Sequence, residues 1–321
     1  MAASISKKVS IRERSILING LVGIHAYRAN RALLAQRFAQ GGYTARETPH
    51  FLLLTREEAP STILAHWFAP HAIDADLGHY FLQELKPLGI LNNAEQFGTI
   101  FAAIVGSLSP YDTQQALELY ARNTLRRYSA LLKKLPEDGY MTPMQNFACL
   151  YKRVMNLLEG ETLLDAGCSF GFLPLLVAEH VPACHSITAI DIQADPFPIV
   201  EMLAKERGFR HIAYEQADIL HPAFRFRGPF DTVVILHVLE HFKEDEMYLT
   251  LKHLLEVTTK RLIIAVPFEK GSPEQVYGHE QLFDRVRLEA LGEWCVEQMH
   301  GQGTFHYEDC ADGLLVIQRK N

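Results

Sequence analysis

From Thr162 to the C-terminus, short apolar runs alternate with segments of helical spacing. The apolar runs are rich in β-branched residues, which is typical of strands buried on both faces of a sheet. Strands that alternate with helices form a mostly parallel sheet with right-handed crossovers. The pattern therefore predicts an α/β fold with a doubly wound, mostly parallel sheet. The runs are ETLLDAG, SITAIDI, HIAYEQAD, FDTVVILHV, RLIIAVPF and GLLVIQRK, and the helical segments are GFLPLLVAEHV, FPIVEMLAKERG, EDEMYLTLKHLLEVTTK and EQLFDRVRLEALGEWC.

The first 140 residues lack this alternation. Their patterns predict a mostly helical α+β domain with an accessory, substrate-binding or lid role, and the second domain spans 141–321. The segment Pro136–Pro143 (PEDGYMTP) is rich in breakers and is the expected linker. The expected strands are Ser15–His25 and His50–Thr55 around a helix near Asn30–Gln40, and the expected helices are Asp74–Leu88, Ala94–Leu108, Asp112–Leu135 and Gln145–Leu158.

Composition excludes several classes of protein. The 31 Lys and Arg against 38 Asp and Glu give a net charge of -7, which provides no general attraction to nucleic acid. No apolar run reaches the roughly 18 residues that a membrane span needs, and the N-terminus lacks the pattern of a signal peptide. The 5 cysteines form no C-x-x-C pair, and the histidines outside the candidate site, including His66, His71 and His79, show no recognisable metal spacing. We therefore expect a cytoplasmic protein with no metal and with neither nucleic acid nor membrane as partner; composition does not indicate an oligomeric state.

The segment DAGCSFG joins the first strand of this alternation to the following helix. Gly167 and Gly171 lie at the turn, where glycine allows the backbone to approach a ligand closely. A dinucleotide-binding fingerprint would need glycines at 167, 169 and 172, but Ser169 and Phe172 occupy two of these positions. Asp165 precedes the first glycine, and a carboxylate there repels a pyrophosphate but suits an ammonium or sulfonium. The loop therefore argues against NAD and for S-adenosylmethionine.

Two more acids end the next two strands. Asp191 is placed to accept both hydroxyls of a ribose, and Asp218 to accept from an adenine amino group. Ile192 and Ile219 follow these acids and can enclose a purine between them. Each acid alone can equally cap the following helix. Three acids at successive strand ends favour a nucleoside site.

Residues from about 160 to 318 resemble class I S-adenosylmethionine-dependent methyltransferases. The resemblance rests on DAGCSFG, with Ser169 in place of the usual middle glycine, on Asp191 and Asp218, and on FDTVVILHVLEHF. It implies a Rossmann-like methyltransferase sheet, mostly parallel with an antiparallel last strand. It also implies S-adenosyl-L-methionine as cofactor, with S-adenosyl-L-homocysteine as product. The residues expected to bind the cofactor are Asp165, Gly167, Ser169, Gly171, Asp191, Ile192, Asp218, Ile219 and His237. The resemblance does not identify the methyl acceptor, because fold and cofactor do not determine the substrate.

Two histidines are candidates for the chemistry. His237 ends the fourth strand, where it can act as a base, hold the acceptor, or be satisfied by cofactor or backbone. Many methyltransferases of this type carry a Gly-His…Phe segment after the fifth strand, and by that resemblance His279 is the candidate general base. The alternative is that His279 organises its loop. Glu269 and Tyr277 are candidate substrate contacts.

A narrower resemblance involves more of the chain. HVLEH, AVPFE, YGHEQLFD and the upstream YARNTL are similar to mycofactocin oligosaccharide methyltransferases. Those cytosolic enzymes methylate a sugar hydroxyl on a glycosylated redox cofactor, so the resemblance implies a glycoside as acceptor. Tyr120, Arg122 and Tyr140 are then candidate substrate contacts. The alternative for Tyr120 and Arg122 is an amphipathic helix with a basic face.

The leading hypothesis is therefore an O-methyltransferase of a small molecule. An N- or C-methyltransferase of another natural product would keep the same cofactor residues. A non-catalytic module that binds S-adenosylmethionine would be expected to have lost acids or a filled glycine loop, and neither is seen. A nucleic-acid methyltransferase would usually carry a basic face or an Asn/Asp-Pro-Pro-Tyr/Phe motif, whereas this chain has HVLEH and a net negative charge.

Overall fold

The chain divides into two compact units, residues 1–127 and 128–321. The computed structural model describes residues 14–18, 22–26, 36, 38–56, 62–135, 141–310 and 313–320, with the backbone alone for the first two ranges and for 225–226. The division between the units lies within α4 (Thr113–Lys133). Residues 136–140 of the expected linker lie outside the described residues, and Pro143 begins α5 (Pro143–Leu157). The accessory or lid role of a first domain over 1–140 stays a prediction.

The first unit contains a five-stranded sheet in the order β1-β2-β5-β4-β3. Strands β2 and β5 are parallel, and the other neighbours are antiparallel. The expected strand Ser15–His25 is instead the hairpin of β1 and β2. Strands β3 and β5 were not predicted; β3 (TARE) is fully exposed and carries no apolar pattern. The strands are β1 (Arg14–Ile18), β2 (Val22–Ala26), β3 (Thr44–Glu47), β4 (Phe51–Thr55) and β5 (Thr62–His66).

Helices follow this sheet along the chain. The expected helix Asp74–Leu88 is broken into α2 (Leu77–Tyr80), a π-helical turn (Phe81–Leu85) and a 3-10 turn (Lys86–Leu88). Pro87 lacks a backbone N–H, and Gly89 ends the segment in a left-handed conformation, so an α-helix cannot continue here. A 3-10 turn (Pro70–Ala72) precedes these segments, and α3 (Ala94–Gly106) and α4 follow as expected. Of the helix expected near Asn30–Gln40, residues 36 and 38–40 are described, and they are helical.

The second unit is built on a seven-stranded sheet in the order β11-β12-β10-β9-β6-β7-β8. The five strands from β10 to β8 are parallel to one another, and β12 pairs antiparallel with both β10 and β11. This topology confirms the predicted doubly wound, Rossmann-like methyltransferase sheet. Only the edge strand β11 (GTFHYE) escaped prediction, because polar residues dominate it. The strands are β6 (Thr162–Ala166), β7 (Ser186–Asp191), β8 (Ile212–Gln216), β9 (Phe230–Leu236), β10 (Thr258–Val266), β11 (Gly303–Glu308) and β12 (Gly313–Arg319).

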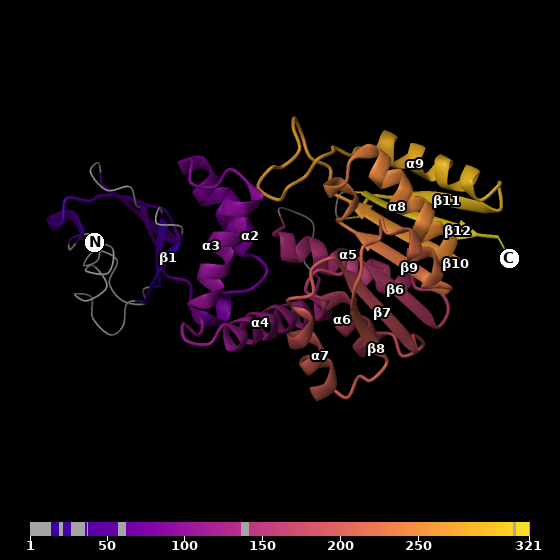
Figure 1. Cartoon of the computed structure of the whole chain (residues 1–321), viewed down its shortest axis with the longest axis horizontal. Helices are drawn as coiled ribbons and strands as arrows, with labels where there is room; N and C mark the ends of the chain where they lie inside the picture. The colour runs from indigo at the N-terminus through magenta and orange to yellow at the C-terminus, as the bar shows by residue number, and fades with distance from the viewer. Residues whose placement is uncertain are drawn as a thin grey trace. The chain divides into compact units, whose positions relative to one another are not determined.

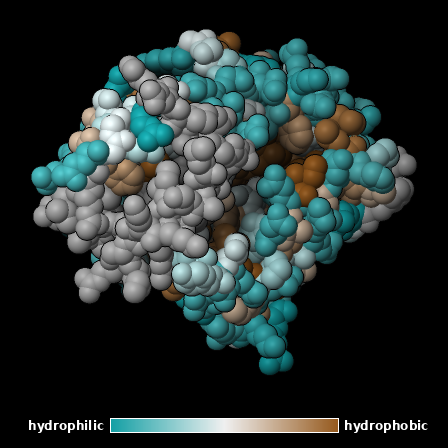
Figure 2. Space-filling model, turned by 60° about the vertical axis from the view of Figure 1, so that its left-hand side comes forward, coloured by the Kyte–Doolittle hydropathy of each residue, from teal (hydrophilic) through white to brown (hydrophobic). Residues whose placement is uncertain are grey.

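Two helical layers cover this sheet (Figure 1). Helices α5, α6 (Phe172–His180) and α7 (Phe197–Glu206) form one layer, and α8 (Glu244–Val257) and α9 (Arg285–Gln298) form the other. Short 3-10 turns lie at Pro222–Phe226 and Leu239–His241. The core side chains of β9 and β10 are fully buried, among them Val233, Ile235 and Ile264. The visible face in Figure 2 is mainly hydrophilic, as expected when the apolar residues lie inside.

The connections of the sheet reverse direction between β6 and β9. Strands β6, β7 and β8 follow one another outward, and β9 then returns to pair with β6 on its other side. In doubly wound sheets, ligands bind outside the carboxyl ends of the strands at such a switch point. No helix in the described part of the chain is long and apolar enough to cross a membrane.

Candidate active site

The glycine loop after β6 depends on two glycines in the left-handed conformation. Gly167 has φ +79°, and a Cβ there would lie 2.4 Å from Val238 Cγ2. Gly171 has φ +73°, caps α6, and a Cβ there would lie 2.4 Å from the ring of Tyr214. Larger residues would therefore strain the backbone and also collide with neighbours. Both predicted glycines are required by the turn itself.

Asp165 lies buried at the end of β6 beside this loop. Burial, together with the nearby Asp191, raises the pKa of its carboxyl to about 7. A carboxyl with this pKa changes charge near neutrality, and a bound cation would favour its ionised form. The side chain is therefore suited to an ammonium or sulfonium ligand, as the sequence predicted.

Asp191 ends β7, and its carboxylate bonds to the loop after β6 and to the loop after β7. Its Oδ2 accepts from the backbone N–H of Ser169 at 2.8 Å, and its Oδ1 accepts from Gln193 N at 2.9 Å. Ser169 itself has φ 51°, so the position of the usual middle glycine is still left-handed. Asp191 is thus already a structural acceptor, and each of its oxygens keeps a further lone pair for a ribose hydroxyl.

The third strand end differs from the first two. Asp218 is exposed, and its Oδ1 accepts from Leu220 N at 2.8 Å. Ile192 is 64% exposed, so it offers a large apolar face to a ligand. Ile219 is only 7% exposed and packs into the core cluster of the sheet. Of the two isoleucines expected to enclose a purine, Ile192 therefore offers much more surface.

His237 follows β9 with a positive φ of 54°. Its backbone N–H donates to Ala265 O at 2.8 Å, and its ring packs on Phe147 of α5 at a centroid distance of 4.8 Å. Burial, together with the neighbouring His279 and His241, lowers the pKa of its imidazole to about 4. His237 is therefore neutral near pH 7 and is a weak base.

His279 and Glu269, in the loop after β10, form a hydrogen-bonded pair. The distance from His279 Nδ1 to Glu269 Oε1 is 2.7 Å, and Glu269 Oε2 accepts from Glu274 N at 3.0 Å. Glu269 is thus a positioning residue for the imidazole. The ring of Tyr277 lies 5.7 Å from that of His279. This pair leaves Nε2 of the buried His279 available to a ligand, which is the geometry of an oriented general base.

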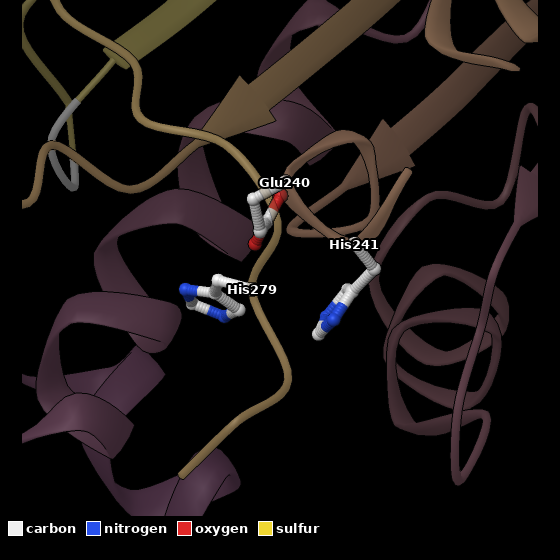
Figure 3. Close-up of side chains that lie close together, drawn as sticks. All are labelled: Glu240, His241 and His279. Carbon is white, nitrogen blue, oxygen red and sulfur yellow. The ribbon is translucent and has the colours of Figure 1, made fainter. Parts of the chain in front are cut away.

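Glu240 and His241, in the 3-10 turn after β9, lie beside this pair (Figure 3). The backbone O of Glu240 accepts from Glu280 N at 2.8 Å, which ties the loop after β9 to the loop after β10. Burial raises the pKa of the Glu240 carboxyl to about 8, and Glu269 adds to this effect. The sequence analysis assigned no role to Glu240; the signal that could have indicated one is the adjacency of Glu240 and His241 at a strand end.

Two of the predicted substrate residues lie in the first unit, and a third lies outside the described residues. Tyr120 is buried in the first unit, and its ring packs on Phe101 at 5.2 Å. Arg122 Nε donates to Glu118 Oε1 at 2.8 Å on the same helix. Tyr140 lies outside the described residues. For Tyr120 and Arg122 a role toward substrate stays a prediction.

Comparison with known proteins gives a match to part of the second unit. Residues 163–261, just under a third of the chain, match the family model of the methyltransferase domain. The matched segment contains the glycine loop, Asp191, Asp218, His237 and Glu240. It supports the class I methyltransferase resemblance and the predicted cofactor, S-adenosylmethionine, which this family uses.

Curated relatives match over the same region. The chain is 34% identical over 86 residues to a ubiquinone biosynthesis O-methyltransferase of Erwinia tasmaniensis, covering 27% of this chain and 34% of the relative. It is 26% identical over 100 residues to a probable (S)-tetrahydroprotoberberine N-methyltransferase of Papaver bracteatum, covering 31% of this chain and 27% of the relative. The chain thus spans about a third of the length of these relatives.

Among solved structures, one similar chain is an O-methyltransferase family protein from Burkholderia thailandensis. It has a TM-score of 0.47 and 12% identity, over 90% of this chain and 83% of that one. The magnesium protoporphyrin IX methyltransferase from Synechocystis with bound S-adenosylhomocysteine has a TM-score of 0.42 and 16% identity, over 60% and 94% of the two chains.

Proposed function

We propose that this protein transfers a methyl group from S-adenosylmethionine to a hydroxyl of a small molecule. The observation that carries the proposal is the His279–Glu269 pair at 2.7 Å, beside His237 at the carboxyl edge of the sheet. A hydroxyl must lose a proton when it is methylated, whereas a neutral amine needs no base to attack a sulfonium. An oriented imidazole therefore favours O-methylation over N-methylation.

The residues of the glycine loop fit this cofactor. S-adenosylmethionine supplies an electrophilic methyl group on a sulfonium. Asp165 would hold its cationic end, and Asp191 would accept the ribose hydroxyls. The left-handed conformations of Gly167 and Gly171 shape the loop that would face the cofactor, and the exposed Ile192 would cover the purine. Asp218, Ile219, Ser169 and His237 complete the proposed cofactor site.

On the acceptor side, each residue has a separate task. His279 Nε2 takes the hydroxyl proton, and Glu269 stabilises the imidazolium that forms, in the manner of a carboxylate–histidine pair. His237 holds the acceptor by hydrogen bonding, because its lowered pKa makes it a poor base. Holding the hydroxyl in line with the methyl group can lower the activation barrier by about 7–11 kcal/mol.

The finer proposal is that the acceptor is a sugar hydroxyl on a glycosylated cofactor such as mycofactocin. It is supported by the resemblance of HVLEH, AVPFE, YGHEQLFD and YARNTL and by the polar groups on the acceptor side. The first domain then binds the glycan or closes over it, with Tyr120, Arg122 and Tyr140 as candidate contacts and Tyr277 near His279. A cytoplasmic location belongs to the same proposal.

The test combines ligand binding with product analysis. S-adenosylhomocysteine is titrated calorimetrically into the full chain, and S-adenosylmethionine with a labelled methyl group is then incubated with glycosides, other alcohols and amines. We expect binding and label in a methyl ether. Label on an amine or carbon would overturn the O-methyl proposal, and binding without transfer to any acceptor would indicate a binding module. Label only on a non-sugar hydroxyl would overturn the glycoside alone.

A further inference from the structure

Glu240, His241 and His279 come together from two loops that are distant in sequence (Figure 3). One ligand atom from each, a carboxylate oxygen and two imidazole nitrogens, lies within 4.8 Å of the others. The rings of His241 and His279 are 4.9 Å apart. Ligands of one ion with bonds of about 2.0–2.2 Å are separated by roughly 3–4 Å. His241 is exposed, so its side chain is the one of the three with room to adjust toward an ion.

The Glu240 carboxylate has no other visible function. Its residue is 1% exposed, and neither oxygen has a hydrogen-bond partner among the described residues. The Nδ1 atom of His237 lies 3.6 Å from Oε1, which is beyond hydrogen-bonding distance. Buried polar groups in folded proteins are nearly always hydrogen-bonded or bound to a cation, because leaving them unpaired is costly. The side chain is thus held ready for a ligand that the protein itself does not supply.

Both histidines are oriented through the same ring nitrogen. His279 Nδ1 is bonded to Glu269 Oε1 at 2.7 Å, and His241 Nδ1 lies 3.3 Å from Gly278 O. When Nδ1–H donates to an oxygen, the lone pair is on Nε2. Histidines that bind metals are characteristically fixed in this way, by a carboxylate or a backbone carbonyl behind the ring.

We propose that Glu240, His241 and His279 bind one divalent transition-metal ion. Two imidazoles and one carboxylate are a donor set typical of Zn²⁺ and of related ions such as Co²⁺ and Mn²⁺. Three protein ligands leave an open coordination position. The position faces the carboxyl edge of the sheet, since Glu240 and His241 follow β9 and His279 follows β10.

The consequence for the reaction rests on the proposed function. An acceptor hydroxyl bound at the open position would become more acidic and lose its proton to water. The oxygen would then attack the methyl carbon, and the sulfonium sulfur would retain the electron pair of the broken bond. With the ion bound, His279 serves as a ligand, and the ion promotes deprotonation of the acceptor hydroxyl. Without the ion, the His279 imidazole would itself be the base.

The test uses Co²⁺ as a probe on the full chain after treatment with a chelator. We expect one Co²⁺ per chain, with visible absorption typical of nitrogen and oxygen ligands, and competition by Zn²⁺. Glu240→Gln and His241→Ala should each weaken binding about 10-fold or more. His180→Ala, which removes another exposed histidine at the end of α6, is the matched control and should bind Co²⁺ normally.

Each variant is also titrated with S-adenosylhomocysteine, which reports on folding and on the proposed function separately. Protein that binds S-adenosylhomocysteine but not Co²⁺, or variants that bind Co²⁺ as the wild type does, would overturn the metal site alone. Stoichiometric Co²⁺ binding that depends on Glu240 and His241, without S-adenosylhomocysteine binding, would support the metal site and overturn the proposed function. A His241→Ala variant that loses Co²⁺ but keeps S-adenosylhomocysteine would support both.

Discussion

The carboxyl edge of the large sheet has two halves that are built differently. In the cofactor half, the loops after β6 and β7 are both held by the Asp191 carboxylate, which accepts from the backbone N–H groups of Ser169 and Gln193. In the acceptor half, the loops after β9 and β10 meet through contacts between distant segments. His279 is held there by Glu269, while Glu240 has no hydrogen-bond partner within the described residues.

The difference shows how such a site divides its tasks. The cofactor half is shaped by glycine conformations and backbone donors, so it is complete before a ligand arrives. The acceptor half contains the buried Glu240 carboxylate, whose oxygens have no hydrogen-bond partner among the described residues. Its chemistry therefore depends on what is bound there. Val238 links the two, because its side chain fills the space beside Gly167.

The largest effect is expected in the acceptor half. His279→Ala should lower turnover about 100-fold or more, because the group that activates the hydroxyl, directly as a base or as a ligand of the proposed ion, is lost. Affinity for S-adenosylhomocysteine should stay unchanged if the halves are independent. Steady-state kinetics and calorimetry measure the two effects, with His180→Ala as control. Turnover at the wild-type level would remove His279 from the catalytic residues.

The next effect is expected in the cofactor half. Asp191→Ala should weaken S-adenosylhomocysteine binding roughly 10- to 100-fold, because a charge-assisted hydrogen bond contributes about 1.5–3 kcal/mol. Calorimetric titration measures the change. Asp195→Ala, which removes an exposed acid from the following loop, is the matched control. Unchanged affinity in Asp191→Ala would contradict the ribose assignment.

A glycine pair tests the contact between the halves. Gly167→Ala should lower the free energy of unfolding by about 1–3 kcal/mol more than Gly208→Ala does, because overpacking adds to the strain. Both glycines have a positive φ, +79° and +80°, but a Cβ at Gly208 meets nothing within 4 Å. Chemical denaturation gives both values. Equal losses of unfolding free energy in the two variants would mean that the Val238 side chain can be displaced without cost.

The smallest effect concerns pH. Asp165 has a pKa of about 7 in the free protein, and a cationic ligand favours its ionised form, so binding releases its proton. Affinity for S-adenosylhomocysteine should therefore fall as pH drops below 7, by about tenfold for one full pH unit below the pKa at most. Titrations between pH 6 and 8 measure the slope. The Asp165→Asn variant should bind S-adenosylhomocysteine more weakly, with an affinity that does not change over this pH range. An equal slope in that variant would assign the titration to another group.

Sequence patterns predicted the large sheet well. Six of its strands were visible as apolar runs because buried strands must be hydrophobic on both faces. Strand β11 and the exposed strand β3 carry too little apolar pattern to be recognised. In the first unit, the sequence separated neither β1 from β2 nor the short helical segments around Pro87, since their limits depend on local turn geometry.

For the site, the sequence by itself determined the glycine loop and the acids at the strand ends. Each of them lies at a fixed position of its own strand–loop–helix unit. It also identified His237, His279 and Glu269 individually. Only the tertiary structure paired Glu269 with His279 and left Glu240 buried beside two histidines. Burial and free lone pairs depend on which loops meet across the sheet edge, and spacing along the chain does not encode that.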